Sequence, residues 1–141
     1  MVSEILVVDD DDIMLDLLEM FLGEHGYNLT RATDGAQAIN ALAGKNFDLV
    51  ITDLEMGQIS GFDVIQRAKE QCRKTIIIMI TSCHGVEHEI KALRLGADFF
   101  LFKPFSMSAL LRCIQVQEIR TDFYSSVQML HRERRFGRES G

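Results

Sequence analysis

Hydrophobic and polar positions alternate along the chain in a pattern that predicts five strands and five helices. Short apolar runs lie at residues 5–8, 28–32, 49–52, 76–80 and 99–102, and the run at 28–32 is the weakest of them. Three of the runs are nearly continuous Val, Ile and Leu, which is typical of parallel strands covered on both faces. Five strand–helix units in succession predict an α/β fold with a doubly wound parallel sheet.

The segments between the strands have the features of amphipathic helices. The first helix is expected to bury one face formed by Ile13, Leu17, Leu18, Phe21 and Leu22. Alternatively, Ile13 and Met14 could form an exposed apolar docking spot for a histidine kinase or phosphotransfer helix. Further helices are expected at about residues 35–43, after residue 61 and at 86–95, with glycines at several of their ends. Ser106 is a suitable N-cap for the fifth helix.

Polar residues of particular kinds follow four of the predicted strands. They are Asp9 and Asp10 after the first strand, Asp53 after the third, Thr81 after the fourth and Lys103 after the fifth. Ligands of doubly wound sheets bind at the carboxyl ends of the strands, near the switch in strand order. We therefore expect these side chains to meet at one edge of the sheet.

Together these residues favour phosphoryl chemistry. Crowded carboxylates attract a hard divalent cation, and oxygen ligands of this kind suit Mg²⁺. A carboxylate such as Asp53 can attack a phosphoryl group and hold it as an acyl phosphate, while Lys103 and Thr81 hold the phosphoryl oxygens. Each residue alone has an ordinary structural explanation as a turn, cap or surface residue, so the inference depends on their joint occurrence.

The same segments resemble the receiver domain of two-component response regulators, the family of the chemotaxis regulators. The order and spacing agree over about residues 5–116, and the matching motifs are Leu6-Val7-Val8-Asp9-Asp10, Ile51-Thr52-Asp53-Leu54-Glu55-Met56, Gly61, Thr81-Ser82, Gly96-Ala97-Asp98 and Lys103-Pro104-Phe105. The resemblance implies a flavodoxin-like fold, with five parallel strands in the order 2-1-3-4-5 and five helices. It implies a receiver domain at residues 1–118, followed by a helical linker or tail at 119–141.

The resemblance also implies a role for each site residue. Asp53 is the expected phosphoacceptor, and the expected Mg²⁺ ligands are Asp10 and Asp53 directly, Asp9 through water and Glu55 through its backbone carbonyl. Thr81 and Lys103 are expected to bind the phosphoryl group, Thr81 and Phe100 to form the switch, and the bond before Pro104 to be cis. The chain departs from the family pattern in having Gly57 for a proline and Phe100 for a tyrosine, and Glu55 and Cys83 stand at positions that tune phosphoryl lifetime.

By this resemblance the chain is a signalling domain and not an enzyme. It is expected to accept a phosphoryl group from a sensor histidine kinase or phosphotransfer protein, and to switch a homodimer contact or a downstream effector through its fourth helix, fifth strand and fifth helix. One alternative is a Mg²⁺-dependent phosphohydrolase with an aspartyl-phosphate, but such enzymes place the nucleophile after the first strand. The other is a pseudo-receiver that binds partners without phosphorylation, although the key residues are all present.

The composition limits which partners and which cellular compartment are expected for the protein. The net charge of −6 argues against direct nucleic-acid binding. Three scattered cysteines fit reduced thiols, and with no basic leader or long apolar stretch the chain is expected to be cytoplasmic and free of membrane contact. Ile119, Phe123, Val127 and Leu130 recur at helical spacing in the tail. This tail fits either a stand-alone receiver or the front piece of a longer regulator.

Overall fold

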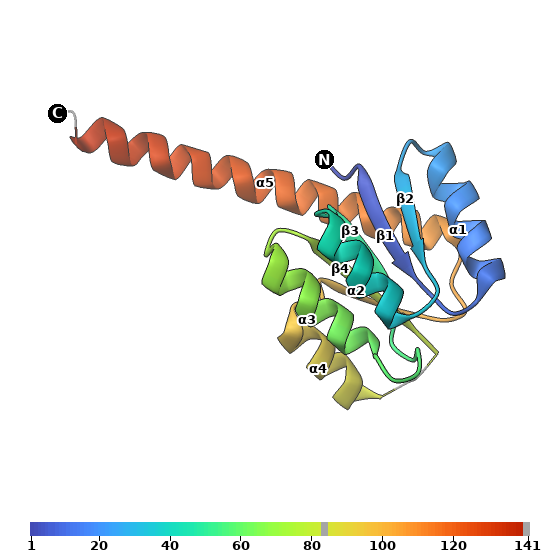
Figure 1. The fold of residues 1–141 in the computed structure, drawn as a ribbon. Helices are drawn as coiled ribbons and strands as arrows, with labels where there is room; N and C mark the ends of the chain where they lie inside the picture. Colours follow the sequence, from blue (N-terminus) through green and yellow to red (C-terminus); the bar gives the residue numbers. More distant parts are fainter. Residues whose placement is uncertain (83–84, 140–141) are drawn as a thin grey trace.

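The computed structural model describes residues 1–82 and 85–139 of the 141-residue chain. Strands and helices alternate strictly along it (Figure 1). In chain order they are β1 (Glu4–Val8), α1 (Asp12–Glu24), β2 (Asn28–Ala32), α2 (Gly35–Gly44), β3 (Leu49–Asp53), α3 (Gly61–Gln71), β4 (Ile76–Thr81), α4 (Val86–Leu95), β5 (Phe99–Phe102) and α5 (Met107–Glu139).

The five strands form one parallel sheet in the order β2-β1-β3-β4-β5, which confirms the predicted fold. The register brings the carboxyl ends of the strands close to one level. Val8 of β1 pairs with Thr52 of β3, and Asp53 pairs with Ile80 of β4. The order reverses at β1, so the residues after β1 and β3 lie at the switch point.

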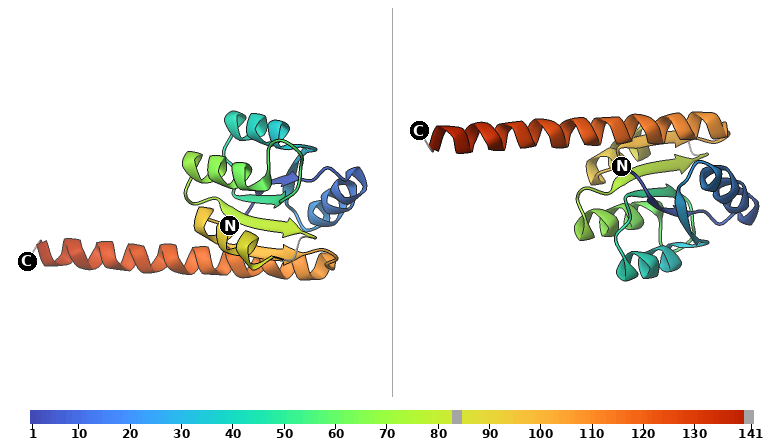
Figure 2. Two further views of the ribbon diagram at one scale, coloured as in Figure 1. Left: turned by 90° about the horizontal axis from the view of Figure 1, so that it is seen from below. Right: turned by 90° about the horizontal axis from the view of Figure 1, so that it is seen from above.

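Helices cover the sheet on both faces, α1 and α5 on one side and α2, α3 and α4 on the other (Figures 1 and 2). Successive side chains of a strand point to opposite faces. In β1, Ile5 and Val7 therefore pack with α1 and α5, whereas Leu6 and Val8 pack with the other three helices. Two apolar cores hold the strands rigidly, and the polar strand ends are fixed with them.

One expectation about α1 is wrong. Ile13 and Leu17 were expected on the buried face, but their side chains are 72% and 49% exposed. The buried residues of α1 are instead Leu15, Leu18 and Leu22, which have the i, i+3, i+7 spacing of a single helix face. The first half of this helix carries more apolar residues than one face can bury, so the pattern alone does not decide which are exposed.

Helix α5 is the longest element, with 33 residues. It begins as expected, because the hydroxyl oxygen of Ser106 accepts a hydrogen bond from the backbone N–H of Ala109 at 3.0 Å. The helix runs without a break past residue 118, and its C-terminal half projects from the rest of the domain (Figures 1 and 2). Within the described residues, no helix has both the length and the apolar character that crossing a bilayer requires.

Candidate functional site

Three carboxylates meet at the carboxyl edge of the sheet. One oxygen each from Asp9, Asp10 and Asp53 lies within 4.8 Å of the other two. Asp9 and Asp53 are only 3% and 8% exposed, whereas Asp10 is exposed to solvent. The arrangement follows directly from the topology, because Asp9 and Asp10 come just after β1 and Asp53 ends the adjacent strand β3.

Backbone groups orient the two buried carboxylates. The backbone N–H of Asp11 donates to Oδ1 of Asp9 at 2.9 Å, and that of Glu55 donates to Oδ1 of Asp53 at 3.2 Å. Any residue type except proline can supply a backbone N–H, so no sequence pattern indicates these two contacts. These contacts use only Oδ1, so Oδ2 of each carboxylate can face the amine of Lys103.

Lys103 joins the two buried carboxylates. Its Nζ donates to Oδ2 of Asp53 at 2.8 Å and to Oδ2 of Asp9 at 3.0 Å. The residue follows β5, where its backbone N–H donates to the carbonyl of Thr81 at 2.8 Å, and its peptide bond to Pro104 is cis. Burial by itself lowers the pKa of Lys103, but the hydrogen bonds and charges of Asp53 and Asp9 outweigh burial and raise it above the ordinary lysine value. The ammonium is therefore charged at neutral pH.

Thr81 and Phe100 lie on the two strands beside the acidic cluster. Thr81 is the last residue of β4 and is completely buried, next to the end of β3. Phe100 of β5 is half-buried, packs against the core beneath α2, α3 and α4, and has its ring centroid 5.2 Å from that of Phe102. Cys83, at one of the positions expected to tune phosphoryl lifetime, lies outside the described residues.

The loop between β3 and α3 owes its path to two glycines. Gly57 has φ +86°, a left-handed conformation that proline cannot adopt, so the family's proline would not fit this loop as it stands. Gly61 begins α3 directly against β3, and a Cβ atom there would lie within 2.5 Å of the carbonyl oxygen of Asp53. The side chain of Glu55 in the same loop is exposed.

The donor set fits a hard divalent cation. In the described part of the chain the three clustered carboxylates are countered by the single ammonium of Lys103, so excess negative charge remains. Oxygen ligands with an open, partly exposed side suit Mg²⁺, which keeps several waters. Asp9, Asp10 and Asp53 are the side chains that would hold it, and the solvent-exposed position of Asp10 leaves room for further ligands.

Replacing Lys103 by methionine is expected to destabilise the domain by about 2–3 kcal/mol, because two buried carboxylates lose their cation. Urea unfolding of the variant and the wild type at neutral pH measures this loss. Lys45→Met is the matched control, since Lys45 forms an exposed ion pair with Glu4 at 3.0 Å and should cost under about 1 kcal/mol. Equal losses for the two variants would contradict a structural role for Lys103.

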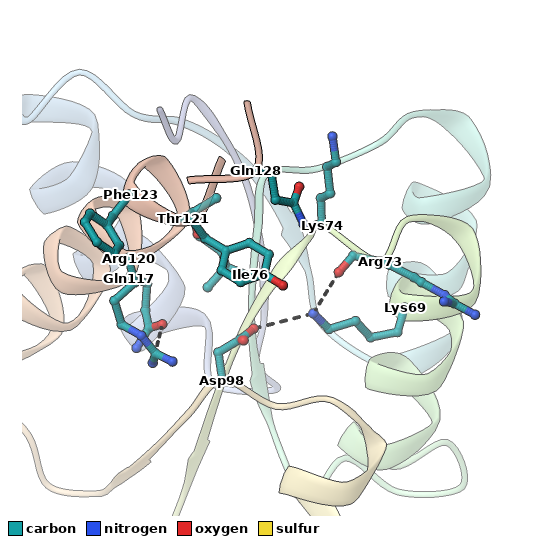
Figure 3. A pocket seen from close by; sticks show the side chains of 11 residues that line it. Lys69, Arg73, Lys74, Ile76, Asp98, Gln117, Arg120, Thr121, Phe123 and Gln128 are labelled. Atoms are coloured by element: carbon teal, nitrogen blue, oxygen red, sulfur yellow. Dashed lines mark hydrogen bonds and ion pairs between the residues drawn. The ribbon is translucent and has the colours of Figure 1, made fainter. Parts of the chain in front are cut away.

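A separate pocket of about 510 Å³ lies at the opposite edge of the sheet (Figure 3). It is formed by the end of α3, the start of β4, Asp98 before β5, and the projecting part of α5. The ammonium of Lys69 in this pocket already has partners, because its Nζ donates to the carbonyl of Thr75 at 2.6 Å and lies 3.5 Å from Asp98. The pocket contains none of the acidic strand-end residues, so the chemistry described above does not depend on it.

Comparison with known proteins gives a consistent family match. A family model described as the response regulator receiver domain matches residues 5–115. The transcriptional regulatory protein TcrA of Mycobacterium tuberculosis is 37% identical over 106 residues, which cover 75% of this chain and 42% of TcrA. The chain spans about half the length of the curated relatives that it matches.

Solved structures agree with the fold. A CheY-like receiver domain protein from Methanospirillum hungatei superposes with a TM-score of 0.83 over 88% of this chain and 99% of its own, and at 24% identity it supports the fold alone. The DrrB receiver domain in its BeF3-activated state is 27% identical and superposes with a TM-score of 0.75, over 83% of this chain and 97% of its own.

Proposed function

This chain belongs to the response regulator receiver domain family of two-component systems, and from that membership we propose that it accepts a phosphoryl group on Asp53 and thereby changes which partner it binds. The observation that carries the proposal is the contact of one ammonium, Lys103, with two buried carboxylates at the switch point of the sheet. A lysine with a purely structural role needs only one carboxylate partner, whereas Lys103 contacts two. A carboxylate cluster that keeps excess negative charge suits a site that binds Mg²⁺ and then a phosphoryl group.

In the proposed transfer, a carboxylate oxygen of Asp53 attacks the phosphorus of a phosphohistidine on a sensor kinase or phosphotransfer protein. The new P–O bond forms as the P–N bond breaks, and the imidazole leaves with the electron pair. Bound Mg²⁺ would supply charge neutralisation on the phosphoryl oxygens, held by Asp9, Asp10, Asp53 and the backbone carbonyl of Glu55. Lys103 would exchange its contact with Asp53 for a phosphoryl oxygen.

The proposed output uses Thr81 and Phe100. A phosphoryl group adds roughly −1.5 to −2 charges and new acceptor oxygens beside β4. The Thr81 hydroxyl moves to those oxygens and Phe100 turns into the space, which reshapes the face formed by α4, β5 and α5. A shift from about 1:99 to 99:1 needs roughly 5.5 kcal/mol of differential binding, so Lys103, Thr81 and the metal must act together.

We further propose that the receiver domain covers residues 1–118 and that residues 119–141, of which the last two lie outside the described residues, form a helical linker or tail in which α5 continues. The setting we propose is the cytoplasm, with a kinase or phosphotransfer protein upstream and an effector downstream. TcrA and other relatives bear the name of transcriptional regulators, so a transcriptional effector is the favoured class. The acidic charge of this chain argues that any DNA contact is made by another domain or protein.

The test is phosphorylation by a small donor. With acetyl phosphate and Mg²⁺, the protein should gain one phosphoryl group by intact-protein mass spectrometry, and the gain should disappear when EDTA removes the metal. Beryllofluoride, which mimics the phosphoryl group, should raise the melting temperature under the same metal dependence. A protein that binds neither would instead be a pseudo-receiver. Sustained turnover of a generic phosphate ester would instead support the phosphohydrolase.

A further inference from the structure

Helix α5 carries a row of exposed and half-buried apolar side chains between residues 116 and 130, which we call the apolar stripe. The side chains of Ile119 and Phe123 at its centre are 69% and 70% exposed. Its members follow one another at spacings of three, four, four and three residues, and they are Val116, Ile119, Phe123, Val127 and Leu130. With 3.6 residues per turn, these positions fall within an arc of roughly 80° along one side of the helix.

Most of the apolar stripe lies on the side of α5 away from the sheet, although Phe123 also lines the pocket beside the start of β4. The residues of α5 that are buried against the sheet are Leu110, Cys113, Ile114 and Gln117. By the same helical geometry, the centre of the stripe lies roughly 130° around the helix from the centre of that buried face. A second helix can therefore lie along the stripe without displacing any contact that α5 makes with its domain.

This part of α5 has only peripheral contacts within the chain: the hydroxyl of Tyr27 donates to Glu118 at 2.6 Å, and the N-terminal ammonium lies 3.6 Å from Asp122. None of the residues 118–124 and 126–130 is buried. A helical segment of this length is marginal in water by itself, and most helical stability comes from packing an apolar face. Figures 1 and 2 show the segment extending away from the sheet and from the other helices. A helix of this kind with aromatic and aliphatic side chains exposed requires a partner surface.

We propose that the partner is a second copy of this chain, with the two α5 helices packed side by side and parallel along the apolar stripe. Packing about a two-fold axis covers the stripe of both copies, and a stable interface of this kind buries about 1,200 Å² or more in total. The stripe carries no charge, so two identical stripes meet without repulsion. Its first three spacings sum to 11 residues, and an 11-residue period favours a right-handed supercoil of the two helices.

Flanking charges select the parallel orientation. Arg120 and Asp122 lie on opposite sides of the apolar stripe, both exposed, and Asp122 also forms an exposed ion pair with the N-terminal ammonium at 3.6 Å. A two-fold axis along the helices places the Arg120 side of one copy against the Asp122 side of the other, whereas an antiparallel pair would bring like sides together. The parallel pair places both domains at the same end and on the outer sides of the two helices.

Sedimentation of the whole chain over a range of concentrations tests the pairing. We expect a monomer–dimer equilibrium, weakened on the order of 100-fold or more by the double variant Ile119→Glu/Phe123→Glu. The matched control is Tyr124→Glu/Met129→Glu, which makes the same charge change at two exposed apolar residues of α5 outside the stripe. It should leave dimerisation within about threefold of the wild type, because it removes no central contact. A wild type that stays monomeric, or equal effects of the two variants, would overturn the proposal.

A separate experiment tests whether the two α5 helices are parallel. In a parallel pair Ile119 lies opposite its own copy, so Ile119→Cys should form an interchain disulfide under mild oxidation. Met129→Cys and the unchanged protein, which retains its native cysteines, are the controls and should not. A stripe-dependent dimer without this disulfide would overturn the parallel arrangement. Neither experiment uses a phosphodonor, so their outcomes are distinct from those of the Asp53 chemistry.

Discussion

Replacing Asp53 by asparagine is expected to abolish phosphorylation while leaving the domain folded. The amide lacks the nucleophilic oxygen anion, so the acyl phosphate cannot form. Asparagine has nearly the same shape, and its carbonyl oxygen can still accept from Nζ of Lys103 and from the backbone N–H of Glu55. Intact-protein mass spectrometry with acetyl phosphate and Mg²⁺ should show no adduct. The free energy of unfolding measured in urea should change by about 1 kcal/mol or less.

The control for this variant is Asp12→Asn. Asp12 is an exposed carboxylate in the first turn of α1, close in sequence to Asp9 but outside the cluster. Replacing it by asparagine makes the same change in charge as Asp53→Asn. This control variant should become phosphorylated as the wild type does. An adduct that persists on Asp53→Asn would show that another residue accepts the phosphoryl group, and the proposed assignment of Asp53 would then be wrong.

Gly61→Ala is expected to cause the largest loss of stability of any substitution considered, about 3 kcal/mol or more. The new Cβ would lie within 2.5 Å of the backbone carbonyl of Asp53 and 3.0 Å from Cα of Leu54. Backbone atoms cannot turn aside as a flexible side chain can, so α3 must move away from β3. Because the same movement displaces Asp53, the rate of phosphorylation should fall together with the free energy of unfolding.

Gly23→Ala is the matched control for this prediction. Gly23 also lies in a helix, but a Cβ there would meet nothing within 4 Å. Alanine should stabilise α1 by up to about 1 kcal/mol, because glycine loses more backbone entropy on folding. Chemical denaturation of both variants compares the two sites directly. A Gly61→Ala protein as stable as Gly23→Ala would mean that α3 and β3 are not in the close contact seen in the structure.

The fold was largely predictable because its central strands β1, β3 and β4 are buried on both faces. The continuous apolar runs of β3 and β4 have no helical or alternating interpretation that fits their length, and the glycines and caps between strands limit each helix. Helix α1 was harder, because Ile13 and Leu17 are apolar and yet exposed. A single sequence cannot separate an apolar residue kept for contact with a partner from one kept for the core.

For the site, the sequence indicated which side chains meet but not how they are joined. Asp9, Asp53 and Lys103 were expected at one edge from the ends of β1, β3 and β5, and the structure brings them together. That one ammonium contacts both carboxylates depends on distances that no local pattern encodes. The backbone donors at Asp11 and Glu55 have no side-chain signature at all.

The uninterrupted course of α5 has a mechanical consequence. Its first turns are packed against the sheet through Leu110 and Ile114, whereas its C-terminal half projects away from the domain. The segment beyond residue 118 is roughly 30 Å long at 1.5 Å per residue, so a tilt of about 10° at the packed turns moves its far end by about 5 Å. Helix α5 thus acts as a lever, converting a small rearrangement at the edge of the sheet into a displacement as large as one helical turn.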